Sequence, residues 1–103
     1  MKLSEYQEKA IKTAVYPADV AVPYLTMGLA GEAGEVLNKA KKIIRGDYDD
    51  DPERAEEVYN QIAMELGDTL WYIAVLANEL GSNLDLIAAA NICLLYTSPS
   101  PRD

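Results

Sequence analysis

Residues 70–80, LWYIAVLANEL, decide the fold of this chain, because their apolar side chains fall on almost every side of a helix. A helix that is hydrophobic all round either lies buried in a protein core or spans a membrane. No apolar run in the chain reaches the roughly 18 residues that a bilayer-spanning helix needs. We therefore expect this stretch to belong to a buried central helix, and we expect no association with a membrane.

Signals on both sides of this stretch define where its helix begins and ends. Asp51 is a suitable N-cap, and Pro52 suits the first helical position, where its missing N–H costs nothing. Gly81 follows the last apolar residue and is a typical helix stop. The sequence therefore predicts a helix over residues 52–80.

Helical periodicity predicts three further helices. One covers residues 4–15 with Ser4 as its N-cap, and a second covers residues 24–45 and ends before Gly46. A fourth begins near Asn83, which is a plausible N-cap. The connector between the first two helices is bracketed by Pro17 and Pro23. Because no segment alternates as a strand does, we expect an all-α fold with four helices in each protomer.

Chain length argues for self-association. A chain of 103 residues has a thin core, and helix 52–80 carries apolar side chains on all its faces. One four-helix protomer cannot cover them all. The sequence therefore predicts that protomers assemble, as a dimer or larger, into an oligomeric helical bundle.

Composition excludes several classes of function. The net charge is −8, with 17 acidic against 9 basic residues, which argues against binding of a nucleic acid polymer. The chain has no histidine, so His-based zinc sites and Ser-His-Asp chemistry are excluded. The single cysteine and the absence of a signal-peptide pattern suit a reducing, cytoplasmic setting.

The acidic run DYDDD invites a calcium-loop interpretation, which fails on spacing. Such a loop needs a glutamate at its twelfth position, and the twelfth residue from Asp47 is Val58. The run is better interpreted as a solvated turn before the helix at residues 52–80.

Two acidic motifs are the candidates for a catalytic, metal-binding site. They are Glu32-Ala-Gly-Glu35 and Glu65-Leu-Gly-Asp68, and both lie in otherwise apolar helical stretches. Carboxylates three residues apart share one helix face, and partly buried like charges repel each other. A single pair of this kind is usually a solvated surface. Two pairs on neighbouring helices instead favour a site for a hard cation, Mg²⁺ or Mn²⁺.

Cationic and aromatic residues continue the same helix faces. Steps of three and four lead from Glu35 to Lys39 and Lys42, and from Asp68 to Tyr72. Carboxylates that hold a metal beside ammonium groups that hold phosphate oxygens are typical of a metal-dependent phosphate site. Glycines inside the two helices suggest close helix approach or ligand access, and they are Gly31, Gly34 and Gly67.

The stretches GLAGEAGEVLNKAKKIIRG and ELGDTLWYIAVLANELG resemble the MazG-like, all-α nucleoside triphosphate pyrophosphohydrolases, with their E-x-x-E and E-x-x-D motifs. The resemblance covers about residues 3–92. It implies a homodimer or homotetramer and a Mg²⁺-dependent reaction in which Mn²⁺ is a possible substitute. The catalytic, metal-binding acids that it implies are Glu32, Glu35, Glu65 and Asp68. The substrate-binding residues that it implies are Lys39, Lys42, Arg45, Tyr72 and Asn91.

The last residues break the helical pattern. From Cys93 the chain reads CLLYTSPSPRD, which looks like translated sequencing-adaptor sequence. We therefore divide the chain into a pyrophosphohydrolase domain over residues 1–92 and an anomalous, non-native tail over residues 93–103. The family commonly continues beyond the position of Asn91 with a basic segment that helps to hold the substrate, and here the tail replaces it.

The expected reaction splits a nucleoside triphosphate, deoxynucleotides included, into the monophosphate and pyrophosphate. A relative with the same chemistry, phosphoribosyl-ATP pyrophosphohydrolase, is an alternative that the motifs do not separate. A ferritin-like di-iron protein needs Glu-x-x-His motifs, which a chain without histidine lacks. A non-catalytic helical interaction module would have no need of four acids on apolar helix faces.

Overall fold

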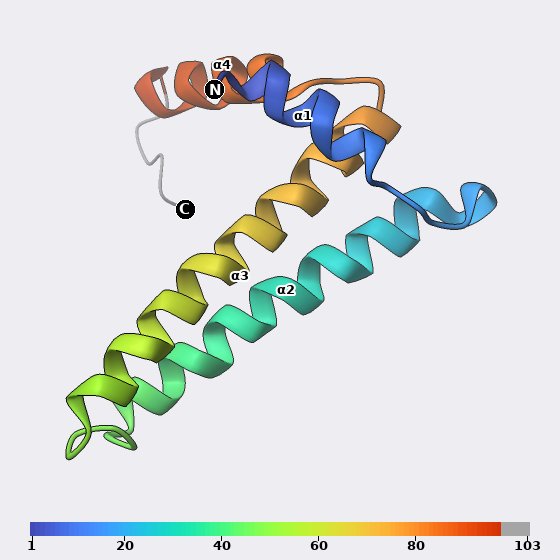
Figure 1. The fold of residues 1–103 in the computed structure, drawn as a ribbon. Coiled ribbons are helices and arrows are strands. Elements are labelled where there is room, and N and C mark those ends of the chain that lie inside the picture. The colour runs from blue at the N-terminus through green and yellow to red at the C-terminus, as the bar shows by residue number, and fades with distance from the viewer. Residues whose placement is uncertain (98–103) are drawn as a thin grey trace.

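The computed structural model describes residues 1–97, and this part of the chain contains helices and no strand. The helices are α1 (Leu3–Lys12), the short 3₁₀ helix η1 (Ala18–Val20), α2 (Ala21–Ile44), α3 (Pro52–Glu79) and α4 (Leu84–Thr97). Helices α2 and α3 form a long antiparallel hairpin, and α1 and α4 lie at the end of it where α3 terminates (Figure 1). The all-α fold with four α-helices is thereby confirmed.

The ends of α3 follow the signals in the sequence. The Asp51 carboxylate accepts a hydrogen bond from the Arg54 N–H at 3.1 Å, and Pro52 is the first helical residue. At the other end, Gly81 adopts a left-handed φ of +73°, and the Ser82 N–H donates to the Ala77 carbonyl. The predicted boundaries of this helix are confirmed to within one residue.

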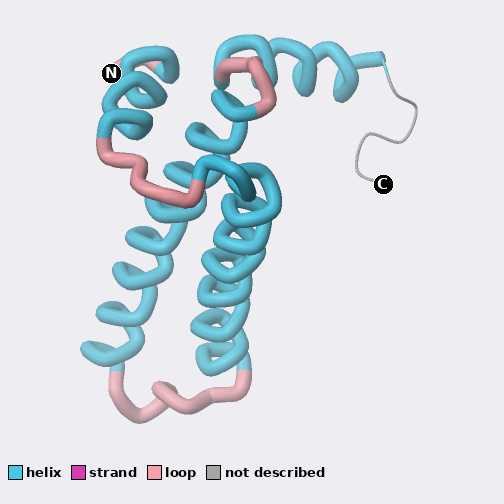
Figure 2. Tube along the Cα trace, turned by 90° about the vertical axis from the view of Figure 1, so that its right-hand side faces the viewer, coloured by secondary structure: helices cyan, strands magenta, loops and turns pink. Residues whose placement is uncertain are grey.

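The turn after α3 sends the chain away from the hairpin. Helix α4 leaves α3 at an angle of 99°, and the tube in Figure 2 shows it projecting from the bundle. The Asn83 side chain accepts a hydrogen bond from the Leu86 N–H at 2.9 Å, as expected of an N-cap. The apolar residues of α4 are mostly exposed, because α1 is its main partner.

Two predicted helix starts are wrong. Ser4 lies inside the first turn of α1, whose N-cap is Lys2, and no side chain caps that end. Helix α2 begins at Ala21, so Pro23 lies within its first turn. The first turn of a helix has no internal partner for its N–H groups, so a proline there loses nothing. For that reason Pro23 does not delay the helix.

The expectation that the helical pattern breaks at Cys93 is also wrong. Helix α4 continues through Cys93 to Thr97. The residues CLLYT contain no glycine or proline, so nothing local ends the helix before the SPSP sequence that follows. The rest of the predicted tail, residues 98–103, lies outside the described residues.

The core is small and sits where α1 and the start of α4 cross the hairpin. Its largest fully buried side chains are Leu25 and Val75. Gln7 is also buried and joins three elements: its amide nitrogen donates to the Ala74 carbonyl at 3.0 Å, and its amide oxygen accepts from the Leu84 N–H at 3.1 Å. This side chain therefore ties α1 to the end of α3 and the start of α4.

Close approach between α2 and α3 depends on Gly28. A Cβ atom added to Gly28 would lie 2.6 Å from Cζ of Tyr72, which is closer than real side chains come. By contrast, a Cβ at Gly31, Gly34 or Gly67 would meet nothing within 4 Å. Of the two explanations offered for those three glycines, close helix approach is found instead at Gly28, one turn before Gly31, and ligand access stays a prediction.

The chain is open and extended. Its Cα radius of gyration is 16.6 Å, against about 13 Å for a compact domain of this length. Many large apolar side chains remain exposed, including Met27 at 73%, Leu37 at 72% and Met64 at 72%. In the described part of the chain no single helix is long and apolar enough to cross a membrane, and α3 and α4 pass that test only as a bent pair.

Candidate metal site

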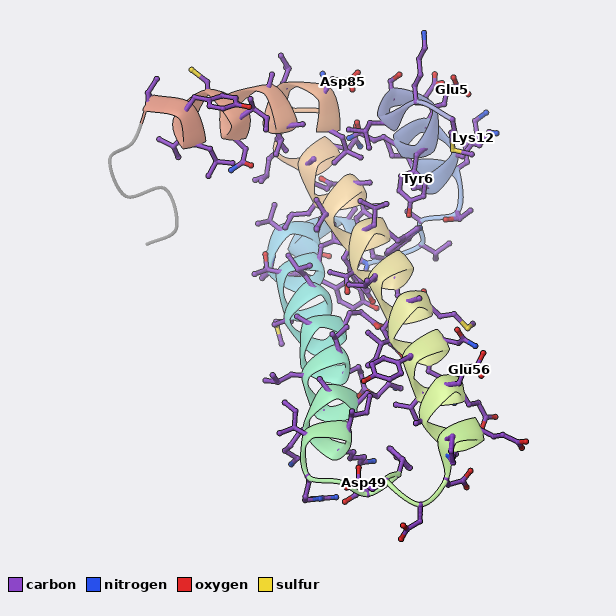
Figure 3. The ribbon with its side chains drawn as sticks, turned by 90° about the vertical axis from the view of Figure 1, so that its left-hand side faces the viewer. Glu5, Tyr6, Lys12, Asp49, Glu56 and Asp85 are labelled. Atoms are coloured by element: carbon purple, nitrogen blue, oxygen red, sulfur yellow. The ribbon has the colours of Figure 1, made fainter. Side chains whose placement is uncertain are left out.

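Three carboxylates from the two long helices meet between them. Glu32 of α2 and Glu65 and Asp68 of α3 each place one oxygen atom within 4.8 Å of the others. Glu32 and Glu65 are half-buried, and Asp68 is exposed. An antiparallel hairpin produces this meeting, because the two acidic motifs lie at similar distances from the connecting loop. The loop itself, marked by Asp49 in Figure 3, is at the end of the hairpin away from α1.

The clustering of these carboxyl groups shifts the pKa values of Glu32 and Glu65 in opposite directions. The hydrogen bond with Glu65 raises the pKa of Glu32, and partial burial and the neighbouring carboxylates raise it further. The same hydrogen bond lowers the pKa of Glu65, and the ammonium of Lys39 lowers it further against the effect of partial burial. The cluster therefore favours any positive charge placed between Glu32 and Glu65, whether a proton or a cation.

Lys39 supplies a positive charge beside Glu65 and Glu35. Its Nζ atom lies 3.3 Å from Oε1 of Glu65 and 3.7 Å from Oε2 of Glu35. Glu35 is the fourth predicted acid, and it is not among the three carboxylates that converge. Its side chain is 58% exposed and lies one turn along α2 beside Lys39. The structure thus brings together three of the four predicted acids and pairs the fourth with a lysine.

A pocket of about 190 Å³ opens at the cluster. Lys39, Glu65 and Asp68 line it together with two residues that the sequence did not single out, Gln61 and Met64. Gln61 precedes Glu65 by one helical turn, so the i,i+4 spacing is the signal that could have identified it. The pocket therefore offers carboxylate, ammonium and amide groups at its walls.

Tyr6 is another neighbour that the sequence did not identify as part of a site. It belongs to α1, and its pKa is raised by partial burial and then by the negative charge of Asp68. The phenol therefore feels the charge of one member of the acidic cluster from a third helix, α1, which carries the label Tyr6 in Figure 3. No sequence spacing relates Tyr6 to Asp68, because only the packing of α1 against α3 brings them together.

The remaining predicted substrate-binding residues do not line this pocket. Arg45 is bound to Asp47 through a hydrogen bond of 2.9 Å at the end of α2. Tyr72 packs edge-on against Trp71, with ring centroids 5.0 Å apart, and lies against Gly28. Lys42 is half-buried one turn beyond Lys39, and Asn91 is exposed on α4.

A second, larger pocket of about 450 Å³ lies between α1 and the corner that joins α3 to α4. It is lined by polar residues such as Ser4, Asn78 and Asn83, and by the acids Glu8 and Asp85. None of the three clustered carboxylates and no lysine lines it, whereas Glu65, Asp68 and Lys39 line the smaller pocket, which is therefore the candidate site for a metal and a phosphate.

Comparison with known proteins points to one family. The sequence pattern of the MazG nucleotide pyrophosphohydrolase domain matches residues 23–93, which include both acidic motifs. The Gene 37 protein of Mycobacterium phage L5 is 41% identical over 98 residues, covering 89% of this chain and 83% of that protein. No solved structure matches the chain.

Proposed function

The chain belongs to the MazG nucleotide pyrophosphohydrolase family, and from this premise we propose that it hydrolyses nucleoside triphosphates to monophosphate and pyrophosphate. We propose further that deoxynucleoside triphosphates are among its substrates and that Mg²⁺ is the cofactor, with Mn²⁺ as a possible substitute. The observation that carries the proposal is the cluster of Glu32, Glu65 and Asp68 beside a pocket that Glu65 and Asp68 line together with Lys39.

The residues of the cluster fit a divalent cation. All three donors are carboxylate oxygens, which are the ligands that Mg²⁺ prefers. The three carboxylates lie within 4.8 Å of one another, and their mutual repulsion raises the pKa of Glu32, so a bound cation would relieve that repulsion. When bound there, Mg²⁺ would polarise a phosphoryl oxygen and offset the charge of the leaving group. The family depends on divalent metals in general, and the identity of the ion is part of this proposal.

The positions of Lys39 and Lys42 indicate how a bound triphosphate would be oriented. Lys39 lies at the carboxylate cluster, and Lys42 follows one turn closer to the end of α2. A triphosphate bound along this stripe would have its α-phosphoryl group at the acids and its terminal phosphates toward Lys42. The lysines would then neutralise the departing pyrophosphate, and attack at the α-phosphorus is favoured over release of the γ-phosphate.

Hydrolysis in ¹⁸O-labelled water tests which bond breaks. Attack of water on the α-phosphorus forms a new bond from the water oxygen to that phosphorus and breaks its bond to the α,β-bridging oxygen. We expect the label in the nucleoside monophosphate and none in pyrophosphate, read by mass spectrometry with dATP and Mg²⁺. Orthophosphate as the first product, or label in the pyrophosphate, would contradict the proposed reaction.

We also propose that the functional unit is a homodimer or homotetramer. The support is the open shape of the protomer and the large apolar side chains that α2 and α3 leave uncovered. Those that are more than half exposed are Met27, Leu37, Ile44, Tyr59, Met64 and Leu66. Burying such surfaces against another copy is the usual way in which a small helical protomer completes its core.

Light scattering measures this assembly directly. At micromolar concentration we expect a mass of at least twice the 11.3 kDa of one chain. Leu66→Glu should shift the mass toward the monomer, because Leu66 is 56% exposed in the protomer and would be covered in the assembly. Glu56→Gln, an exposed change nearer the start of the same helix, is the control and should leave the mass unchanged. A monodisperse monomer of the unaltered chain would refute the proposal.

A further inference from the structure

Lys39 has an environment that phosphate binding alone does not explain. Its side chain is 21% exposed, and its ammonium lies 3.3 Å from a carboxylate oxygen of Glu65, which is itself 20% exposed. It also lies 3.7 Å from Glu35. Among the ion pairs of residues 1–97, those of Lys39 are the only ones that involve the predicted metal-binding acids. Lys39 is therefore the cation that neutralises the cluster in this structure.

The same carboxylate is needed by a metal. Glu65 contributes one of the three oxygen atoms that converge within 4.8 Å. A divalent cation bound among them would stand next to an ammonium that already contacts Glu65. A divalent cation in the cluster and the neighbouring Lys39 ammonium would repel each other. The ammonium is the group that can move away, because it is attached to a flexible side chain of four methylene groups.

The pocket offers the ammonium another position. Lys39 is both a wall of the pocket and a partner of the cluster. Its side chain can therefore swing from Glu65 toward the pocket without any change in the backbone of α2. Phosphate oxygens held in that pocket would give it a new anionic partner.

We propose that Lys39 is a counter-ion that the metal displaces: its ammonium neutralises Glu65 until a divalent cation enters, and the entry releases it to the phosphate chain of the substrate. This inference rests on the proposed function for the identity of the substrate. It makes metal entry and phosphate binding mutually reinforcing, because the lysine is not free for phosphate until the metal has taken its place.

Binding of Mn²⁺ without any nucleotide tests the displacement, with free Mn²⁺ measured by electron paramagnetic resonance. Lys39→Met should bind Mn²⁺ about fivefold or more tightly than the unaltered chain, because a half-buried ion pair no longer competes for Glu65. Lys42→Met removes the same charge one turn away and should change the affinity by less than about twofold. Lys39→Arg keeps the competing charge and should not tighten binding.

Thermal unfolding gives a second measurement on the same variants. With metal removed by EDTA, Lys39→Met should melt at a lower temperature than the unaltered chain, because its clustered carboxylates have lost their counter-ion. In saturating Mg²⁺ the difference should shrink, because the metal has replaced the ammonium in both proteins.

Several results would overturn the inference. They are equal or weaker Mn²⁺ binding by Lys39→Met, an equal tightening by Lys42→Met, and no Mn²⁺ binding by the unaltered chain at millimolar concentration. The proposed reaction is tested by a different measurement, namely the products formed from dATP. Tighter Mn²⁺ binding by Lys39→Met in a chain that does not release pyrophosphate would support the counter-ion role and reject the reaction.

Discussion

Glu65→Gln is expected to lower the rate of pyrophosphate release by about 100-fold or more, measured at saturating Mg²⁺ and dATP. Glu65 contacts both Lys39 and Glu32, and it contributes an oxygen to the three-carboxylate cluster. Glutamine keeps the size of the side chain but loses its negative charge and one of its two acceptor oxygens. The fold should therefore persist while the cluster loses its central ligand.

Glu56→Gln is the matched control for this loss. Glu56 lies on the same helix nearer the connecting loop, where Figure 3 labels it, and its side chain is exposed. We expect the rate of Glu56→Gln to stay within about twofold of the unaltered chain, because screening removes the effect of a distant surface charge. A Glu65→Gln variant as active as the control would show that the candidate site is wrong.

Gly28→Ala is expected to lower the free energy of unfolding by about 1–3 kcal/mol, the usual cost of overpacking a core. The added Cβ would meet the ring of Tyr72 at 2.6 Å from Cζ and 2.9 Å from Cδ1. These are ring atoms and not the end of a flexible chain, and the ring also packs edge-on against Trp71. Helices α2 and α3 would have to separate, or Tyr72 would have to leave its position.

Gly31→Ala provides the comparison, one turn further along α2. A Cβ there meets nothing within 4 Å in the protomer, and alanine favours a helix over glycine by up to about 1 kcal/mol. We therefore expect this variant to be as stable as the unaltered chain or more so in equilibrium urea unfolding. If the two variants lose the same stability, the close approach at Gly28 does not exist in solution.

Much of the site could be predicted from local spacing. Glu32, Glu65 and Asp68 were identified because carboxylates on apolar helix faces are costly, and a hairpin brings such faces together. Glu35 shares its helix face with Lys39 at the i,i+4 spacing, and the two form an ion pair, while Glu35 lies outside the cluster. The spacing is compatible with Glu35 in the metal-binding cluster and with Glu35 in an ion pair with Lys39. The direction of its side chain decides between the two.

Other neighbours could not be predicted, because no local rule relates them. Tyr6 reaches the vicinity of Asp68 only because α1 packs against α3. Gln7 is a polar residue that no sequence pattern marks as buried. It is buried because its amide group forms hydrogen bonds with the Ala74 carbonyl and the Leu84 N–H. Asn91 was predicted from a resemblance, and it lies on a helix that turns away from the hairpin by 99°.

By itself the sequence determined the all-α class, the ends of α3 and the two acidic motifs on facing helices. These features depend on helical periodicity, on capping by Asp51 and Gly81, and on the cost of buried charge, all of which act over a few residues. Tertiary structure decided which glycine allows the helices to meet and which acids converge. It also decided which lysine neutralises them, because such contacts depend on the register between α2 and α3, and that register is set by the packing of whole helices.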